Sequence, residues 1–146
     1  DTGVSFYGVY YGQAALPHAP ESLFYLDNAV IRGLKVYNVE TSSDIPVYDL
    51  GAAAGRDPYE MFLGGARSII RITNPNAAKE RRLIVFRDSF GSSIAPLLTA
   101  GYSEITLVDI RYISPSSLGK LIDFTKADDA LFLYSASVIN NSETIK

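Results

Sequence analysis

Three short apolar runs in the second half of the chain constrain the fold more than any other feature. They cover Leu83–Arg87, Ile105–Asp109 and Ala130–Ser135. Helical patterns separate them: the first ends at Gly101, and the second begins at Ser114 and continues to about Lys126. Runs that are apolar on both faces are typical of strands covered on both sides. The β-α-β-α-β order therefore predicts an α/β fold with a mostly parallel sheet and flanking helices.

The first half of the chain has a different texture. Residues 1–66 are rich in Tyr, Gly, Ala and Pro and predict an irregular part with short strands, such as Gly33–Val39. Asp57 and Pro58 are typical of a helix start, and Gly64-Gly65 would end that short helix. Ser68–Thr73 predicts another strand. We expect one domain over residues 1–146, with the βαβαβ core in residues 67–146.

Composition excludes several classes of function. The 146 residues carry a net charge of −3 without a basic block, which argues against nucleic acid as a partner. There is no cysteine, so a thiolate metal site or a cysteine nucleophile is excluded. Histidine occurs once, so no histidine metal cluster is expected, and no glycine-rich phosphate loop or other cofactor motif is present. No apolar run approaches the roughly 20 residues of a membrane span.

The turn after Leu83–Arg87 is the strongest candidate for chemistry. Asp88 and Ser89 follow the apolar run directly, and Gly91 opens a helical segment. A serine between a rigid strand and a helix N-terminus is placed as a nucleophile, since free N–H groups there favour negative charge. The alternative is that the Ser89 hydroxyl only caps the helix. Asp88 is interpreted as a supporting residue, either a cap or the salt-bridge partner of Arg87.

Polar residues also follow the other two predicted strands. Arg111 comes after the second strand, and Asn140 and Asn141 come after the third. Ligands of parallel sheets bind at the carboxyl ends of the strands, so these side chains are candidates for holding an oxyanion or a substrate. The alternatives are an ion pair of Arg111 with Asp109 or Glu104, and a simple turn at the two asparagines.

A general base is missing from this set. An attacking serine needs one, and it is usually an imidazole oriented by a carboxylate. His18 is the single histidine, and it lies in a proline-flanked loop without a nearby acid. A surface loop histidine is the favoured interpretation, and a catalytic base is the other.

Several motifs together resemble the C-terminal half of the bacterial DHHW family. They are the Met-Phe-Leu-Gly-Gly stretch at 61–65, Asn74–Ala77, Phe86–Pro96 with its Asp-Ser-Phe-Gly turn, and Val108–Tyr112. That family is similar to the SGNH hydrolases and to the alginate O-acetyltransferases. The resemblance implies an SGNH- or flavodoxin-like three-layer fold, incomplete in this chain. It also implies that Ser89 is the nucleophile, with Asn140 or Asn141 as an oxyanion asparagine and Gly64 and Gly65 as possible backbone contributors.

The namesake Asp-His-His-Trp motif of that family is not in this chain. We therefore expect part of an O-acyl (acetyl) esterase or acyltransferase that is inactive as this chain alone. The resemblance implies an acylated glycan or acyl donor as partner, cell-envelope or exported polysaccharide as substrate, and an extracytoplasmic location. An uncovered sheet edge would also allow a homo-oligomer. The alternative function is a non-catalytic carbohydrate-binding or structural domain.

Overall fold

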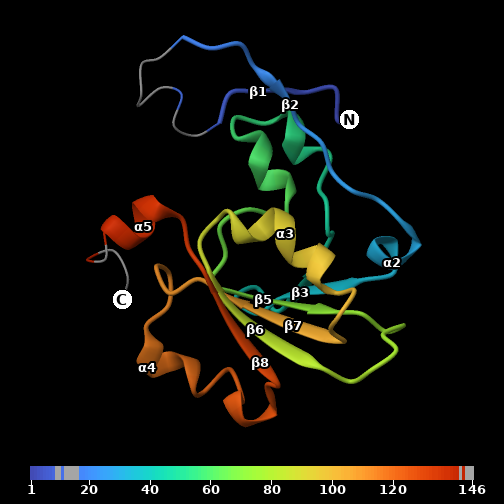
Figure 1. Ribbon diagram of the computed structural model, residues 1–146, viewed down its shortest axis with the longest axis vertical. Coiled ribbons are helices and arrows are strands. Elements are labelled where there is room, and N and C mark those ends of the chain that lie inside the picture. Colours follow the sequence, from blue (N-terminus) through green and yellow to red (C-terminus); the bar gives the residue numbers. More distant parts are fainter. Residues whose placement is uncertain (9–10, 12–16, 142, 144–146) are drawn as a thin grey trace.

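The computed structural model describes residues 1–8, 11, 17–141 and 143 (Figure 1). Its main element is a six-stranded mixed sheet with the order β4-β3-β5-β7-β6-β8. The strands are β3 (Lys35–Asn38), β4 (Ser43–Ile45), β5 (Ile69–Thr73), β6 (Arg82–Arg87), β7 (Glu104–Val108) and β8 (Asp129–Leu133). A separate two-stranded sheet pairs β1 (Ser5–Phe6) with β2 (Glu21–Ser22). The prediction of an α/β fold is confirmed.

Short helices connect the strands. Four α-helices are described: α2 (Ala29–Arg32), α3 (Gly91–Leu98), α4 (Pro115–Leu118) and α5 (Ala136–Asn140). Three 3-10 helices accompany them: η1 (Ala52–Ala54), η2 (Pro58–Met61) and η3 (Phe124–Lys126). The predicted start of η2 is confirmed, because the Asp57 side chain accepts a hydrogen bond from the Tyr59 N–H and Pro58 is the first helical residue.

The prediction of a mostly parallel sheet is wrong. Only β7-β6-β8 run parallel, whereas β5 is antiparallel to β7 and both pairings of β3 are antiparallel. Burial on both faces predicts where a strand lies and leaves its direction open. The direction of β5 follows from its connection to β6, because residues 74–81 form a turn without a helix. Such a short connection reverses the chain, whereas parallel strands need a longer crossover.

Two other expectations are also wrong. The helix expected from Ser114 to about Lys126 is broken into α4 and η3. Gly119 ends α4, and Asp123 starts η3 by accepting from the Thr125 N–H. The third strand, expected to be buried, is the exposed edge strand β8, and the Phe132 side chain is 68% exposed. An open edge with apolar side chains can take up a further strand.

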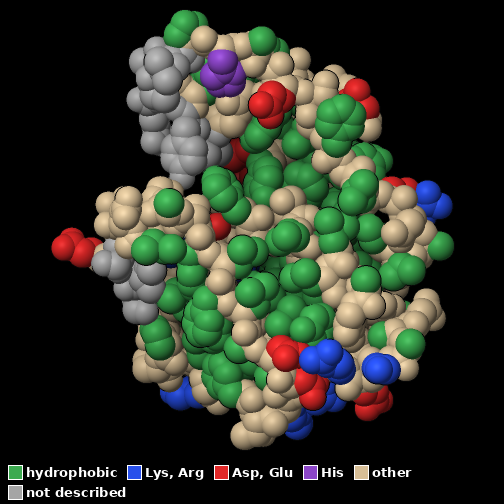
Figure 2. Space-filling view, in the orientation of Figure 1, with side chains coloured by type: hydrophobic (Ala, Val, Ile, Leu, Met, Phe, Trp, Pro, Cys, Tyr) green, Lys and Arg blue, Asp and Glu red, His purple; other side chains and the backbone are tan. Residues whose placement is uncertain are grey.

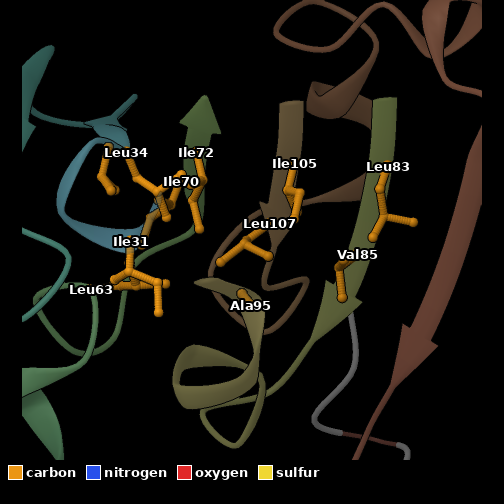
Figure 3. Packing of buried hydrophobic residues seen from close by; sticks show 11 residues of the cluster. Ile31, Leu34, Leu63, Ile70, Ile72, Leu83, Val85, Ala95, Ile105 and Leu107 are labelled. Atoms are coloured by element: carbon orange, nitrogen blue, oxygen red, sulfur yellow. The ribbon is translucent and has the colours of Figure 1, made fainter. Parts of the chain in front are cut away.

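The core lies on both faces of the sheet. On one face, Ile31 of α2 and Ala95 of α3 pack on alternate strand residues (Figure 3). These strand residues are Val36, Ile70, Ile72, Leu83, Val85, Ile105 and Leu107. On the other face, Leu118 and Ile122 of the α4 region cover Ile84 and Val108. On the side of the molecule seen in Figure 2, hydrophobic side chains gather over the middle, Lys and Arg side chains lie mostly along the lower edge, and Asp and Glu side chains are spread around the rim.

The strand order reverses direction at β6. The chain leaves β6 through α3 to reach β7 on one side, and then passes through α4 to reach β8 on the other side. Because both crossovers of such a unit are right-handed, α3 and α4 cover opposite faces of the sheet. The loops after β6 and β7 therefore diverge and open a crevice at the carboxyl end of β6. Ser89 follows β6 at this point.

Candidate functional site

Ser89 opens into a hollow at the carboxyl edge of the parallel strands. The hollow has a volume of about 190 Å³, and the Ser89 side chain is half-buried. Its other lining residues are Asp57, Tyr59, Glu60, Gly65, Ala66, Ser92, Arg111 and Tyr112. Three segments far apart in the sequence meet here: η2 with the following loop, the turn after β6, and the turn after β7.

Asp88 builds the turn that presents Ser89. Its carboxylate is buried and accepts hydrogen bonds from the N–H of Phe90 (3.0 Å) and from the N–H of Ser135 (2.6 Å). The second bond ties the end of β6 to the end of β8. Asp88 is thus the local cap of the turn, and its expected salt bridge with Arg87 does not form, because Arg87 lies next to Asp109 instead.

The Ser89 hydroxyl does not cap the helix. Phe90 is the N-cap residue of α3, and no side chain caps that helix. Among the described residues, neither the hydroxyl nor the N–H of Ser89 has a hydrogen-bond partner, although its carbonyl accepts from the Ser92 N–H at 3.0 Å. The capping alternative is therefore wrong, and a hydroxyl and an N–H remain available beside the hollow.

Asp109 fixes Arg111 against the hollow. Its buried carboxylate accepts from Arg111 Nε at 2.9 Å and from Nη2 at 2.6 Å, and also from the Arg111 backbone N–H at 3.1 Å. The hydrogen bonds to Asp109 raise the pKa of Arg111. The ion pair expected as an alternative role is present, and the same bidentate geometry holds a guanidinium on the wall beside Ser89.

Arg87 lies beneath this layer and is fully buried. Its Nη1 donates to the Asp88 carbonyl at 3.2 Å and lies 3.9 Å from Asp109 Oδ2, while Nε and Nη2 have no partner among the described residues. Burial lowers the pKa of Arg87, and the nearby Asp109 carboxylate opposes this change. Gly91 is required here, since a Cβ at that position would lie 2.7 Å from Arg87 Cβ.

The structure brings together only part of the predicted set. Ser89, Arg111 and Gly65 line one hollow, with Asp88 and Gly91 supporting it. The Gly65 N–H already donates to the Phe62 carbonyl, so this residue contributes space rather than a donor. Gly64, Asn140 and Asn141 are not among the described lining residues. Both asparagines lie at the end of α5, where the Asn141 side chain donates to the Ser137 carbonyl at 3.0 Å.

Sequence reasoning missed the acidic side of the hollow. Asp57 was expected only as a helix cap, and Glu60 had no expected role. Both line the hollow. The aliphatic part of Glu60 lies against Gly65, where a Cβ would meet Glu60 Cγ at 3.2 Å. Tyr59 connects η2 to α3, because its hydroxyl donates to Ser93 Oγ at 2.9 Å. About 30 residues separate these groups from Ser89, so no local spacing could have linked them.

His18 does not line the Ser89 hollow formed by the described residues. It is exposed, as expected for a surface loop histidine, and its ring lies edge-on to Tyr11 at 4.9 Å. Within residues 1–8, 11, 17–141 and 143, no group of three or more acidic, histidine or cysteine side chains is placed to hold a metal ion. Over the same residues, no helix has the length and apolar character needed to cross a bilayer.

Comparison with solved structures connects this arrangement to known proteins. A crystal structure of a DHHW family protein from Eubacterium siraeum superposes with a TM-score of 0.68 over 97% of this chain and 49% of that protein, at 22% sequence identity. The chain has the fold of a DHHW family protein. The resemblance to the DHHW family noted in the sequence is thereby confirmed.

Bacillus cereus PatB1 is a second similar protein. Its structure superposes with a TM-score of 0.58 at 25% identity, and its structure with a sulfonyl adduct superposes with a TM-score of 0.57 at 26% identity. Each match covers 73% of this chain, and 36% and 38% of the PatB1 chain respectively. The chain thus spans about half or less of the proteins that it matches. No protein-family profile and no curated protein matches the sequence.

Proposed function

We propose that this chain is the part of an SGNH-like O-acyl (acetyl) esterase or acyltransferase that carries the nucleophile, Ser89. The observation that carries the proposal is the position of Ser89 at the strand-order reversal, in a hollow shared with Arg111. Such crevices are where open α/β sheets bind ligands. The chemistry of the neighbour agrees, because a sulfonyl adduct forms when a protein nucleophile displaces a leaving group from sulfur.

The residues of the hollow have distinct roles in this reaction. A base removes the proton from Ser89 Oγ as the oxygen attacks the acyl carbonyl carbon, and the carbonyl oxygen takes the negative charge. The Ser89 N–H, which is unpartnered among the described residues, and the Arg111 guanidinium are placed to stabilise that oxyanion. Collapse of the intermediate breaks the bond to the leaving oxygen, which takes a proton. Water or a sugar hydroxyl then accepts the acyl group.

A general base is missing from the described hollow. The carboxylates that line the hollow are Asp57 and Glu60, and no imidazole lies among its described lining residues. The family resemblance implies an Asp–His pair, so we expect the 146-residue chain alone to turn over no substrate. The same resemblance supports a polysaccharide of the cell envelope, or an exported one, as acyl acceptor or acylated substrate, and an extracytoplasmic location.

Acyl transfer tests the proposal directly. The protein expressed from its complete reading frame is incubated with 4-nitrophenyl acetate and chitopentaose, and released nitrophenol and acetylated sugar are measured. We expect activity that Ser89→Ala abolishes. Ser103→Ala is the matched control, because the Ser103 hydroxyl donates to the Arg81 carbonyl at the amino ends of the parallel strands, away from Ser89. Full activity in a folded Ser89→Ala variant would refute the proposal.

A second candidate function is carbohydrate binding without catalysis. It is favoured by the lack of an imidazole among the described residues of the hollow and by a larger hollow next to it. Under this alternative the complete protein binds sugar but neither releases nor transfers acetyl groups, and Ser89→Ala leaves its affinity unchanged.

A further inference from the structure

We infer that the Ser89 hollow is one end of a longer groove that binds a neutral pyranose chain, with Asp57 and Glu60 as the residues that grip the sugar next to the reacting unit. The role of Ser89 as reacting end rests on the proposed function. The groove itself rests on separate observations of geometry, hydrogen-bonding capacity and charge.

Two hollows adjoin and share a wall. The larger one has a volume of about 590 Å³ and is lined by residues 5–8, residues 55–58 and Glu60. Asp57 and Glu60 line both this hollow and the 190 Å³ hollow of Ser89. A ligand that occupies both hollows would therefore contact these two side chains. The larger hollow alone has the volume of a typical small-ligand site, so a sugar unit can bind there beside the Ser89 hollow.

The shared wall has unused hydrogen-bond acceptors. Asp57 Oδ1 accepts from the Tyr59 N–H at 3.1 Å, which leaves Oδ2 without a partner among the described residues. The Glu60 side chain is exposed, and its carboxylate makes no hydrogen bond or ion pair with any described residue. A carboxylate accepts up to four hydrogen bonds, so each can bind vicinal hydroxyl groups. Pyranoses carry such pairs of hydroxyl groups along both ring edges.

Aromatic rings line both hollows. Tyr7 lines the larger hollow and is 45% exposed, while Tyr112 lines the Ser89 hollow and is 53% exposed. Phe6 lines the larger hollow and is stacked on Tyr59, with ring centroids 6.4 Å apart. Exposed tyrosines supply a flat apolar surface and a polar hydroxyl, which matches the apolar faces and polar edges of a sugar ring.

Charge favours a neutral chain over an acidic one. The groove carries two carboxylates, Asp57 and Glu60, and two guanidinium groups, Arg56 and Arg111. Asp109 already binds Arg111 through two nitrogens. Asp57, Glu60 and Arg56 have no ion-pair partner among the described residues, and two negative charges against one positive give the groove a net negative charge. Close like charges oppose binding, and a polyuronate would place a carboxylate on every ring beside Asp57 or Glu60.

Titration calorimetry on the 146-residue chain tests this inference without requiring catalysis. The probes are chitopentaose as the neutral chain and penta-galacturonate as the acidic chain. We expect saturable binding of chitopentaose and no binding of penta-galacturonate at the same concentrations. Glu60→Gln and Asp57→Asn should each weaken binding by about fivefold, which is the difference between a hydrogen bond to a charged acceptor and one to a neutral amide. Asparagine still caps η2, so the second variant retains the fold.

Glu80→Gln is the matched control. Glu80 is exposed and precedes β6, whereas Ser89 follows it, so the two lie at opposite edges of the sheet. This variant should bind chitopentaose like the parent. The inference is overturned if chitopentaose does not bind, if penta-galacturonate binds as tightly, or if Glu60→Gln binds as the parent does. If chitopentaose binds but Ser89 does not react in the complete protein, the proposed function is refuted and the inference about the groove stands.

Discussion

Replacing Asp109 by asparagine should strongly destabilise the protein, because this carboxylate is the counter-charge of two guanidinium groups. Asp109 is fully buried, binds Arg111 through Nε and Nη2, and lies 3.9 Å from Arg87 Nη1. Asparagine keeps the shape and one acceptor oxygen, so the bond to the Arg111 N–H can persist. The charge is lost, and the fully buried Arg87 then has no counter-ion within salt-bridge distance.

The magnitude follows from the burial of the two partners. Arg111 is half-buried and can turn toward water, so the loss of its counter-charge lowers the free energy of unfolding only slightly. Arg87 cannot reach solvent. Removing one partner of a buried ion pair costs about 3–5 kcal/mol, and we expect the lower end, about 3 kcal/mol, or about 10 °C in Tm. Urea unfolding followed by circular dichroism measures the change.

Two further variants make the result interpretable. Asp123→Asn removes an exposed carboxylate at the start of η3 and should leave the urea midpoint unchanged. The double variant Arg87→Met/Asp109→Asn should be more stable than Asp109→Asn alone, because methionine fills the buried volume without a charge. An Asp109→Asn midpoint equal to that of the parent would refute the reasoning that the Arg87–Asp109–Arg111 layer depends on this charge.

Three other substitutions test neighbouring parts of the account. Gly91→Ala should cost about 2 kcal/mol in urea unfolding through overpacking against Arg87, while Gly119→Ala, where a Cβ meets nothing within 4 Å, should cause no loss; equal effects would contradict the close approach. Burial raises the pKa of Tyr134, so the folded protein holds the hydroxyl proton more tightly than the unfolded chain, and stability should fall as the pH rises above about 10. Tyr134→Phe should reduce that fall in urea unfolding measured between about pH 8 and 11. A pH profile equal to that of the parent would contradict this role of Tyr134. Arg111→Lys cannot form the two-nitrogen contact with Asp109, so sulfonylation of the complete protein should slow by about tenfold or more in a variant that circular dichroism shows to be folded; an unaltered rate would remove Arg111 from the site.

The sequence predicted those parts of the fold that depend on local pattern. The positions of β5, β6 and β7 follow from apolar runs, and the predicted bounds agree with the structure within a residue or two. The direction of β5 and the edge position of β8 depend on sheet order, which links segments far apart in the chain. Leu131 and Phe132 are apolar enough for a core strand, and only their neighbours in space decide that they are exposed.

The candidate site divides in the same way. Ser89, Asp88 and Arg111 were predictable because strand ends are visible in the sequence and parallel strands end at one edge. Glu60 and Asp57 were not, since they come from a loop that folds over that edge. The asparagines do not line the described hollow for a related reason: Asn140 is the last residue of α5 and Asn141 caps it, so this helix carries both asparagines away from the end of β8. The rule on strand ends applies to the first residues after a strand.

The central claim is that the Ser89 hydroxyl is the nucleophile, and covalent labelling tests it most directly. The protein from its complete reading frame is treated with phenylmethanesulfonyl fluoride and digested, and the modified peptide is identified by mass spectrometry, with Ser89→Ala in parallel. The account predicts a single adduct on Ser89 that is absent from Ser89→Ala. A folded protein that stays unlabelled, or that carries the adduct on another side chain, would contradict the account.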